Sequence, residues 1–78
     1  MIYRALLQRG EDIALVCARQ HTYHRDRSAA LRALERSAKG KPARGYLWPL
    51  AAGDLTSDGL VARLYSHELP GWVETVAL

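Results

Sequence analysis

The sequence predicts a single α+β domain in which one amphipathic helix packs on an antiparallel sheet of about five strands. Most of its apolar segments alternate with a period of two, as half-buried strands do, and only one segment has a helical period. Glycine, proline and polar residues separate these segments at turn-like positions. With 78 residues the chain has room for one domain, covering residues 1–78. A single helix covers a single sheet face, so we expect a two-layer sandwich.

The beginning of the chain predicts a β-hairpin. Tyr3, Ala5 and Leu7 alternate with the residues between them, which favours a strand. Residues 9–12 are polar and contain a glycine, as expected of a turn. Residues 13–23 alternate again and predict the second strand of the hairpin.

The pattern between residues 26 and 39 predicts the helix. An apolar stripe recurs there at helical spacing, and Gly40 is placed to end the helix in a left-handed conformation. Asp26 is the expected N-cap, with Thr22 and Ser28 as alternative starts. The stripe consists of Ala30, Leu31, Leu34 and Ala38.

The second half of the chain predicts three further strands, which gives the order β-β-α-β-β-β. Residues 46–48 read as a strand that Pro49 interrupts or confines to a sheet edge. Residues 51–59 predict a loop or a single short helical turn. Residues 60–67 alternate, and a turn at 69–71 separates them from a last strand at 72–78.

One sheet face needs a cover in this arrangement. If the helix packs on one face, several apolar side chains on the other form a patch larger than monomers normally expose. Either the 46–59 segment folds over this face, or a partner or a second copy of the chain does. The side chains expected toward the helix are Tyr3, Leu7, Leu15, Cys17 and Leu64, and those expected on the other face are Ile2, Leu6, Val16, Val61 and Tyr65.

Positive charge is concentrated in one segment. Between residues 24 and 44 seven basic residues stand against two acidic ones, a net charge of +5 within a chain of net charge +3. Helical geometry places the basic side chains of the predicted helix opposite its apolar stripe. Such a surface is suited to an acidic protein or a phosphate backbone, although a solvated helix face that only aids solubility has the same pattern. The candidate contact residues are Arg25, Arg32, Arg36, Lys39, Lys41 and Arg44.

Aromatic residues flank this basic segment. Tyr23, Tyr46 and Trp48 offer stacking surfaces for nucleic acid bases, but packing in the core and at a sheet edge is the more common role of such residues in a small domain. The sequence has no recognisable DNA- or RNA-binding motif, so it predicts no specificity.

No catalytic, metal or cofactor site is predicted. On one strand Cys17 and His21 share a face while His24 takes the other, so these residues and His67 do not make a convergent metal site. Ser57 lies in a turn-like run with no base placed for it. A hairpin followed by an arginine-bearing helix is similar to small GIY-YIG nucleases, but the second motif and the metal-binding glutamate of that family are absent.

In its size, charge polarity and lack of catalytic motifs the chain resembles the phage-encoded anti-CRISPR inhibitors of bacterial defence. This resemblance implies a non-enzymatic protein that blocks a nucleic-acid-handling complex by occupying an acidic surface. The ββα opening is also similar to HicB-like antitoxin domains, without their glycine and proline landmarks, which would imply a regulatory homodimer. Direct, non-specific binding of RNA or DNA is the other alternative. The expected oligomeric state is a monomer or a homodimer.

The expected compartment is the cytoplasm. The single cysteine cannot form an internal disulfide, as suits a reducing environment. No apolar stretch approaches the roughly 20 residues that span a bilayer, and no signal peptide is recognisable, so no membrane partner is expected.

Overall fold

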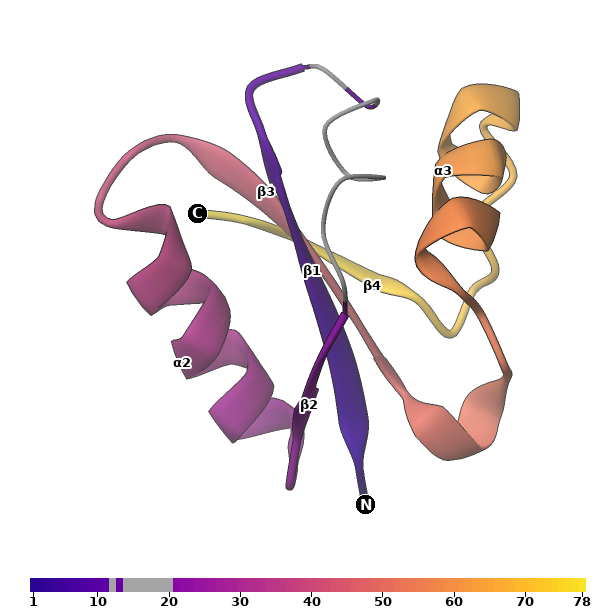
Figure 1. Cartoon of the computed structure of the whole chain (residues 1–78), viewed down its shortest axis with the longest axis horizontal. Helices are drawn as coiled ribbons and strands as arrows, with labels where there is room; N and C mark the ends of the chain where they lie inside the picture. Colours follow the sequence, from indigo (N-terminus) through magenta and orange to yellow (C-terminus); the bar gives the residue numbers. More distant parts are fainter. Residues whose placement is uncertain (12, 14–20) are drawn as a thin grey trace.

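A computed structural model describes residues 1–11, 13 and 21–78, and in this part the chain forms four strands and two α-helices (Figure 1). The sheet is open and antiparallel throughout, with the strand order β2-β1-β3-β4. The α+β class is therefore confirmed, but the described part has four strands and two helices where five strands and one helix were predicted, because residues of the strand predicted at 60–67 belong to a helix. The elements are β1 (Tyr3–Arg9), β2 (Thr22–His24), α2 (Arg27–Ala38), β3 (Ala43–Pro49), the short 3₁₀ helix η1 (Leu50–Ala52), α3 (Ser57–Ser66) and β4 (Glu74–Ala77).

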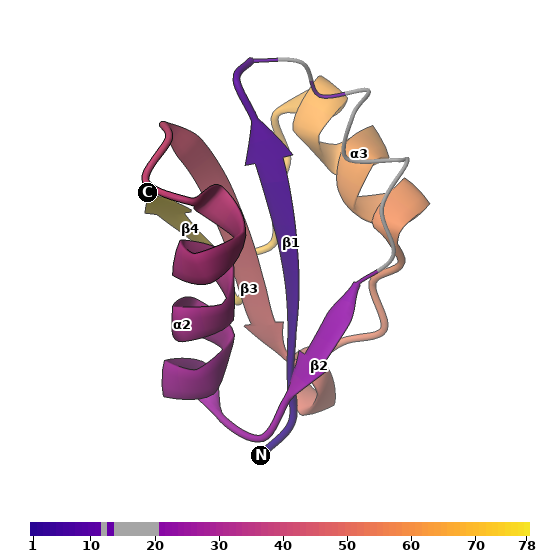
Figure 2. The ribbon, with the colours of Figure 1, turned by 60° about the vertical axis from the view of Figure 1, so that its left-hand side comes forward.

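The two helices lie on opposite faces of the sheet (Figure 2). On one face, Leu34 of α2 packs with Leu7 and Leu47 from the two central strands. On the other face, Leu60 and Val61 of α3 pack with side chains from the same two strands. The molecule thus has three layers rather than the predicted two, because both faces of its sheet are apolar and each needs a cover.

The segment predicted as a strand at 60–67 is the helix α3. Its N-cap is Thr56, whose hydroxyl accepts a hydrogen bond from the Gly59 amide at 3.0 Å. Leu60 and Val61 are buried, whereas Ala62 is exposed, so the buried positions follow a helical stripe rather than an alternation. A short apolar run fits both periods, and the need to cover the sheet favours the helix.

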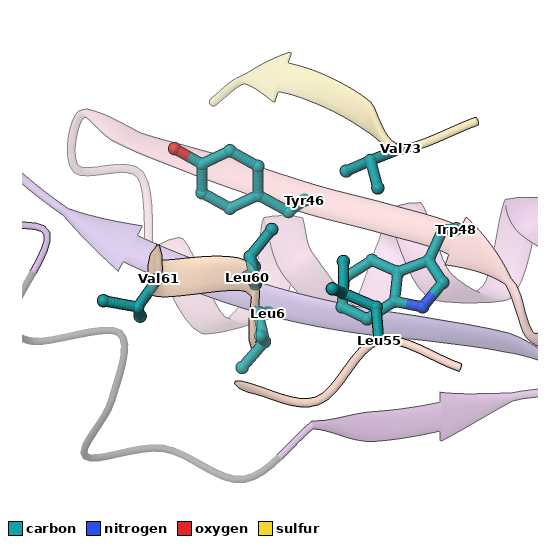
Figure 3. Packing of buried hydrophobic residues seen from close by; sticks show 7 residues of the cluster. All are labelled: Leu6, Tyr46, Trp48, Leu55, Leu60, Val61 and Val73. Carbon is teal, nitrogen blue, oxygen red and sulfur yellow. The ribbon is translucent and has the colours of Figure 1, made fainter. Parts of the chain in front are cut away.

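An apolar cluster under α3 covers the sheet face opposite α2. Its seven buried residues come from β1, β3, α3 and the segments beside α3 (Figure 3). The chain itself therefore buries the face that a sheet-to-sheet homodimer would have used. Leu64 packs here and not on the α2 side as predicted, while Ile2 and Tyr65 stay exposed. The cluster consists of Leu6, Tyr46, Trp48, Leu55, Leu60, Val61 and Val73.

The strand β3 is longer than the predicted 46–48, because residues 43–45 also pair with β1. Gly45 faces α2, and a Cβ atom built there would lie 2.8 Å from Cδ1 of Leu34. A Cβ at this position would displace the end of the Leu34 side chain, so glycine suits the close packing of α2 on β3. Pro49 is its last residue, and β3 lies between β1 and β4 rather than at a sheet edge.

The helix α2 forms as predicted, one residue shorter at each end. The Asp26 carboxylate accepts a hydrogen bond from the Ala29 amide at 2.8 Å, which identifies it as the N-cap. At the other end Lys39 takes the left-handed conformation together with Gly40, with φ values of 55° and 74°. Of the predicted strand at 13–23, residues 22 and 23 lie in β2, which extends to His24 and pairs with residues 3–5 of β1. Positions 12 and 14–20, including Cys17, lie outside the described residues.

Candidate interaction surface

The helix α2 separates an apolar face from a basic one. Ala30, Leu34 and Ala38 are buried against the sheet. Arg32, Arg36 and Lys39, here called the basic row, are all exposed. At about 100° per residue the basic row spans about 60° of the helix surface, directed away from the buried stripe. The predicted arrangement of these three side chains is therefore what the structure shows.

The basic row is not neutralised within the described part of the chain. The ion pairs found there join Arg4 to Asp54, Arg25 to Asp26 and Arg27 to Glu74. None of them involves the basic row, and its side chains point into solvent. Three cations on one exposed helix face, with Glu35 as the acidic residue beside them, create a local positive potential.

Lys41 extends the basic row past the end of the helix. Its amide donates a hydrogen bond to the Ala38 carbonyl at 3.0 Å, which keeps the start of the connector close to the last turn of α2. The side chain of Lys41 is exposed and lines a groove beside the helix. Four of the six predicted contact residues thus lie together around the outer face and the C-terminal end of α2.

The other basic residues near the start of α2 are engaged in ion pairs. Arg25 precedes the helix and lies 3.6 Å from the carboxylate of the N-cap Asp26, with 77% of its side chain exposed. Arg27 donates hydrogen bonds to both carboxylate oxygens of Glu74 in β4, one of them from Nε at 2.8 Å. These hydrogen bonds lower the pKa of Glu74. Arg25 therefore stands apart from the basic row, at the opposite end of the helix, and Arg27 ties α2 to the sheet.

Arg44 lies on the other side of the sheet. Neighbouring residues of a strand point to opposite faces, so Arg44 faces α3 because Gly45 faces α2. It lines a hollow of about 310 Å³ together with Tyr46, Leu64 and His67. The structure does not bring Arg44 to the basic row, although the sequence placed both in one basic segment.

A groove runs between α2 and the strand β4. Its volume is about 600 Å³. Sequence reasoning missed it, because nothing in the sequence shows that the last strand lies beside the helix. The signals that could have indicated it are the alternation of Val76 and Leu78, and the position of Leu31 at the margin of the helical stripe. The groove is lined by Leu31, Glu35, Ala38, Gly40, Lys41, Val76, Ala77 and Leu78.

The histidines do not converge on a metal site within the described residues, but the prediction that Ser57 has no base beside it is wrong, because Ser57 begins α3 and its hydroxyl contacts His21. His21 Nδ1 lies 3.1 Å from the Ser57 hydroxyl, and its pKa is lowered by burial and then by the positive charge of Arg4. His24 lies 2.8 Å from the Thr22 hydroxyl on β2, and His67 ends α3. Among the residues described, no three histidine, cysteine or acidic side chains could jointly hold a metal ion.

The aromatic residues beside the basic segment do not extend the basic surface. Tyr46 and Trp48 are buried in the cluster under α3, which confirms their predicted role in packing. Tyr23 is exposed, but its ring stacks over the Arg4 guanidinium, 5.4 Å from the ring centroid. None of the three offers a stacking surface next to α2.

Comparison with known proteins leaves the surface to be interpreted on its own geometry. No family model matches this chain, and no curated protein or solved structure does either. Among the described residues, no helix has the length and apolar character required to cross a membrane.

Proposed function

We propose that this chain is a non-enzymatic binding protein that uses the basic row and Lys41 to contact an acidic partner in the cytoplasm. The observation that carries the proposal is that these cations are exposed on one side of α2 and make no ion pair within the described chain. The core stripe of α2 lies on the opposite side, so the fold does not require this charge. Placed there, it is available for a partner.

An acidic protein segment fits the surface better than nucleic acid does. The groove beside α2 has an apolar lining formed in part by Leu31, Val76 and Leu78, which suits protein side chains. Single-stranded nucleic acid would add base stacking on aromatic side chains to its phosphate contacts, but Tyr46 and Trp48 are buried away from α2. Direct binding of RNA or DNA through the same cations is the second candidate function.

The mode of action that we propose is stoichiometric blocking. The resemblance to anti-CRISPR inhibitors implies a small protein that occupies the acidic surface of a nucleic-acid-handling complex. A protein of this kind needs a stable, charged contact surface and no reactive group, as the arrangement of α2 provides. The regulatory homodimer has less support, because α3 buries the sheet face that such a dimer would have used.

The test compares two double charge reversals of equal size. Arg32→Glu with Arg36→Glu changes the basic row, and Arg44→Glu with Arg63→Glu changes exposed positions on the α3 side. Each pair takes the formal net charge from +3 to −1, because each of its two substitutions replaces a positive charge by a negative one. Circular dichroism and the urea midpoint of each variant show that the fold is kept.

The probes are poly-L-glutamate, random-sequence DNA and random-sequence RNA, each at low and moderate salt. We expect the unmodified chain and the α3-side variant to bind poly-L-glutamate, and the basic-row variant to lose this binding. Binding to DNA or RNA with a log-log salt slope of about −4 would favour the second candidate. If both variants bind every probe equally, or if no acidic probe binds at low salt, the assignment of the surface is wrong.

A further inference from the structure

The strand β4 has a free edge in the described structure. It is the last strand in the order β2-β1-β3-β4, and its only neighbour there is β3. Ala43 and Leu78 exchange two backbone hydrogen bonds, at 3.4 and 2.9 Å. In an antiparallel ladder such doubly bonded pairs occur at every second position, so Val76 and Glu74 also bond toward β3.

It follows that the backbone groups of Thr75 and Ala77 point away from the sheet. Both residues are exposed, and the backbone of neither residue makes a hydrogen bond to another loop or turn within the described chain. Two N–H and two C=O groups in a row are what an additional strand requires. The edge carries no proline within β4 that would prevent such pairing.

The groove lies along this edge on the α2 side. Val76, Ala77 and Leu78 form one wall, and Leu31 and Ala38 of the helix help to form the other. A strand added beside β4 would point every second side chain into this groove. An extended peptide between an edge strand and a helix is a recurring mode of recognition, in which the backbone supplies affinity and the groove specificity.

The charge around the groove selects the chemistry of the peptide. Glu35 is the acidic residue in the lining, and Lys41 lies in the same lining. Moving round the helix from Glu35, Lys39 follows after about 40° and Arg32 after about 60°. Both are exposed and outside the ion pairs of the described chain. Cations therefore outnumber anions along this rim, which favours acidic side chains in the occupant.

We infer that the groove between α2 and β4 binds an extended acidic peptide segment, which pairs with Thr75 and Ala77 as an additional strand. This inference rests on the proposed function and names the kind of partner that the basic surface takes. Apolar side chains of the segment enter the groove, and acidic ones reach Lys41, Lys39 and Arg32. The segment is part of another protein.

A second copy of the chain is a poorer occupant. Antiparallel pairing of two β4 strands about a two-fold axis would continue the sheet and place both α2 helices on the same face. In that pairing the C-terminal end of one β4 lies beside the N-terminal end of the other, so Lys39 and Lys41 of one copy lie near Glu74 of its partner. Glu74 is already paired with Arg27, so the dimer supplies no free acidic group to these lysines, whereas an acidic segment neutralises them.

The test uses a synthetic peptide of about seven residues, long enough to cover β4 with a short overhang. It carries two valines separated by one threonine, with a pair of glutamates at each end, and both termini are blocked. In two further versions every second backbone amide is N-methylated. One version carries the methyl groups on the odd-numbered amides and the other on the even-numbered amides, so that each blocks one edge of the extended peptide. Because strand addition uses only one edge of the peptide, one methylated version should lose binding and the other should keep it.

Matched variants test the protein side of the pairing. Thr75→Pro removes an amide that points away from β3, and Thr75→Val changes the side chain but keeps this amide. We expect Thr75→Pro to weaken peptide binding about tenfold, the effect of losing one good hydrogen bond, and Thr75→Val to bind as the unmodified chain does. If Thr75→Pro does not fold by circular dichroism, Ala77→Pro and the methylated peptides provide the same comparison.

Hydrogen exchange of the Thr75 and Ala77 amides shows directly whether the peptide pairs with this edge of β4. Protection of both amides on addition of the parent peptide, together with the asymmetric effect of methylation, supports the inference. If both methylated peptides bind as the parent does, or if poly-L-glutamate binds and the peptide does not, strand addition is wrong and the proposed function stands. If no acidic probe binds at low salt, both are wrong. A dimer in light scattering, with these amides protected before peptide is added, identifies a second copy as the occupant and overturns the inference.

Discussion

Two substitutions in α3 test whether this helix is the cover of the second sheet face. In the helix, Leu60 is fully buried with 0% exposed surface, and Ala62 points to solvent. In a strand over the same residues, both side chains would lie on one face. Leu60→Ala and Ala62→Glu therefore have different consequences for the two structures. Leu60→Met, which nearly conserves volume, is the control for disturbing the site.

The expected loss of stability follows from the burial of Leu60. Truncating a buried leucine to alanine costs about 3 kcal/mol, a large part of the roughly 4 to 12 kcal/mol expected for a domain of this length. With a urea m-value of about 1 kcal/mol/M, the midpoint of Leu60→Ala should fall by about 3 M. Ala62→Glu should change the free energy of unfolding by no more than about 0.5 kcal/mol. Equal losses in the two variants, or no loss in Leu60→Ala, would refute the packing described for α3.

Two further predictions concern a close contact and the response to acid. Gly53→Ala should lower the urea midpoint by the equivalent of about 1 to 3 kcal/mol, because the new Cβ would lie 2.6 Å from the Trp72 ring; an unchanged midpoint contradicts this contact. The pKa of His21 is lowered from 6.5 mainly by burial, so the unfolded chain takes up this proton first and stability should decrease as the pH falls below about 6.5. The pKa of Glu74 is lowered from 4.5 by its hydrogen bonds to Arg27, so this pair stabilises the fold above the unfolded pKa and the gain is lost as the pH falls through the folded pKa. Urea midpoints across these pH ranges check both signs, and Glu74→Gln should remove the lower step; a midpoint that rises on acidification would contradict them.

Local patterns predicted the elements whose periodicity is unambiguous. The helical stripe and the N-cap Asp26 gave α2 to within a residue at each end, and the alternation of Tyr3, Ala5 and Leu7 gave the α2-facing side of β1. The prediction of a strand at 60–67 is wrong because the apolar residues of this segment fit both a helical period and an alternation. Thr56 and the acidic Asp58 of the first turn are a helix-start signal, although the same residue types are also typical of a turn.

The positions of the candidate contact residues could be predicted only where these residues lie on a single element. Arg32, Arg36 and Lys39 share a helix face by spacing alone, so the sequence was sufficient for them. The position of Arg44 depends on which way β3 faces, and this follows from the burial of Tyr46 and Trp48 on the α3 side and of Leu47 on the α2 side. The groove depends on the position of β4 beside α2, two elements whose proximity is a property of the sheet order.

The central position of β1 constrains how the chain folds. It pairs on one edge with β2 and on the other with β3, and both partners follow it in the sequence. In the β1–β3 ladder Tyr3 pairs with Pro49 and Arg9 with Ala43. Pairing of the two central strands therefore has to close the long chain segment between them. During synthesis β1 therefore remains without its main partner until residue 49 has left the ribosome. Folding is then expected as one late cooperative event, with no stable unit formed by the residues up to the end of α2 alone.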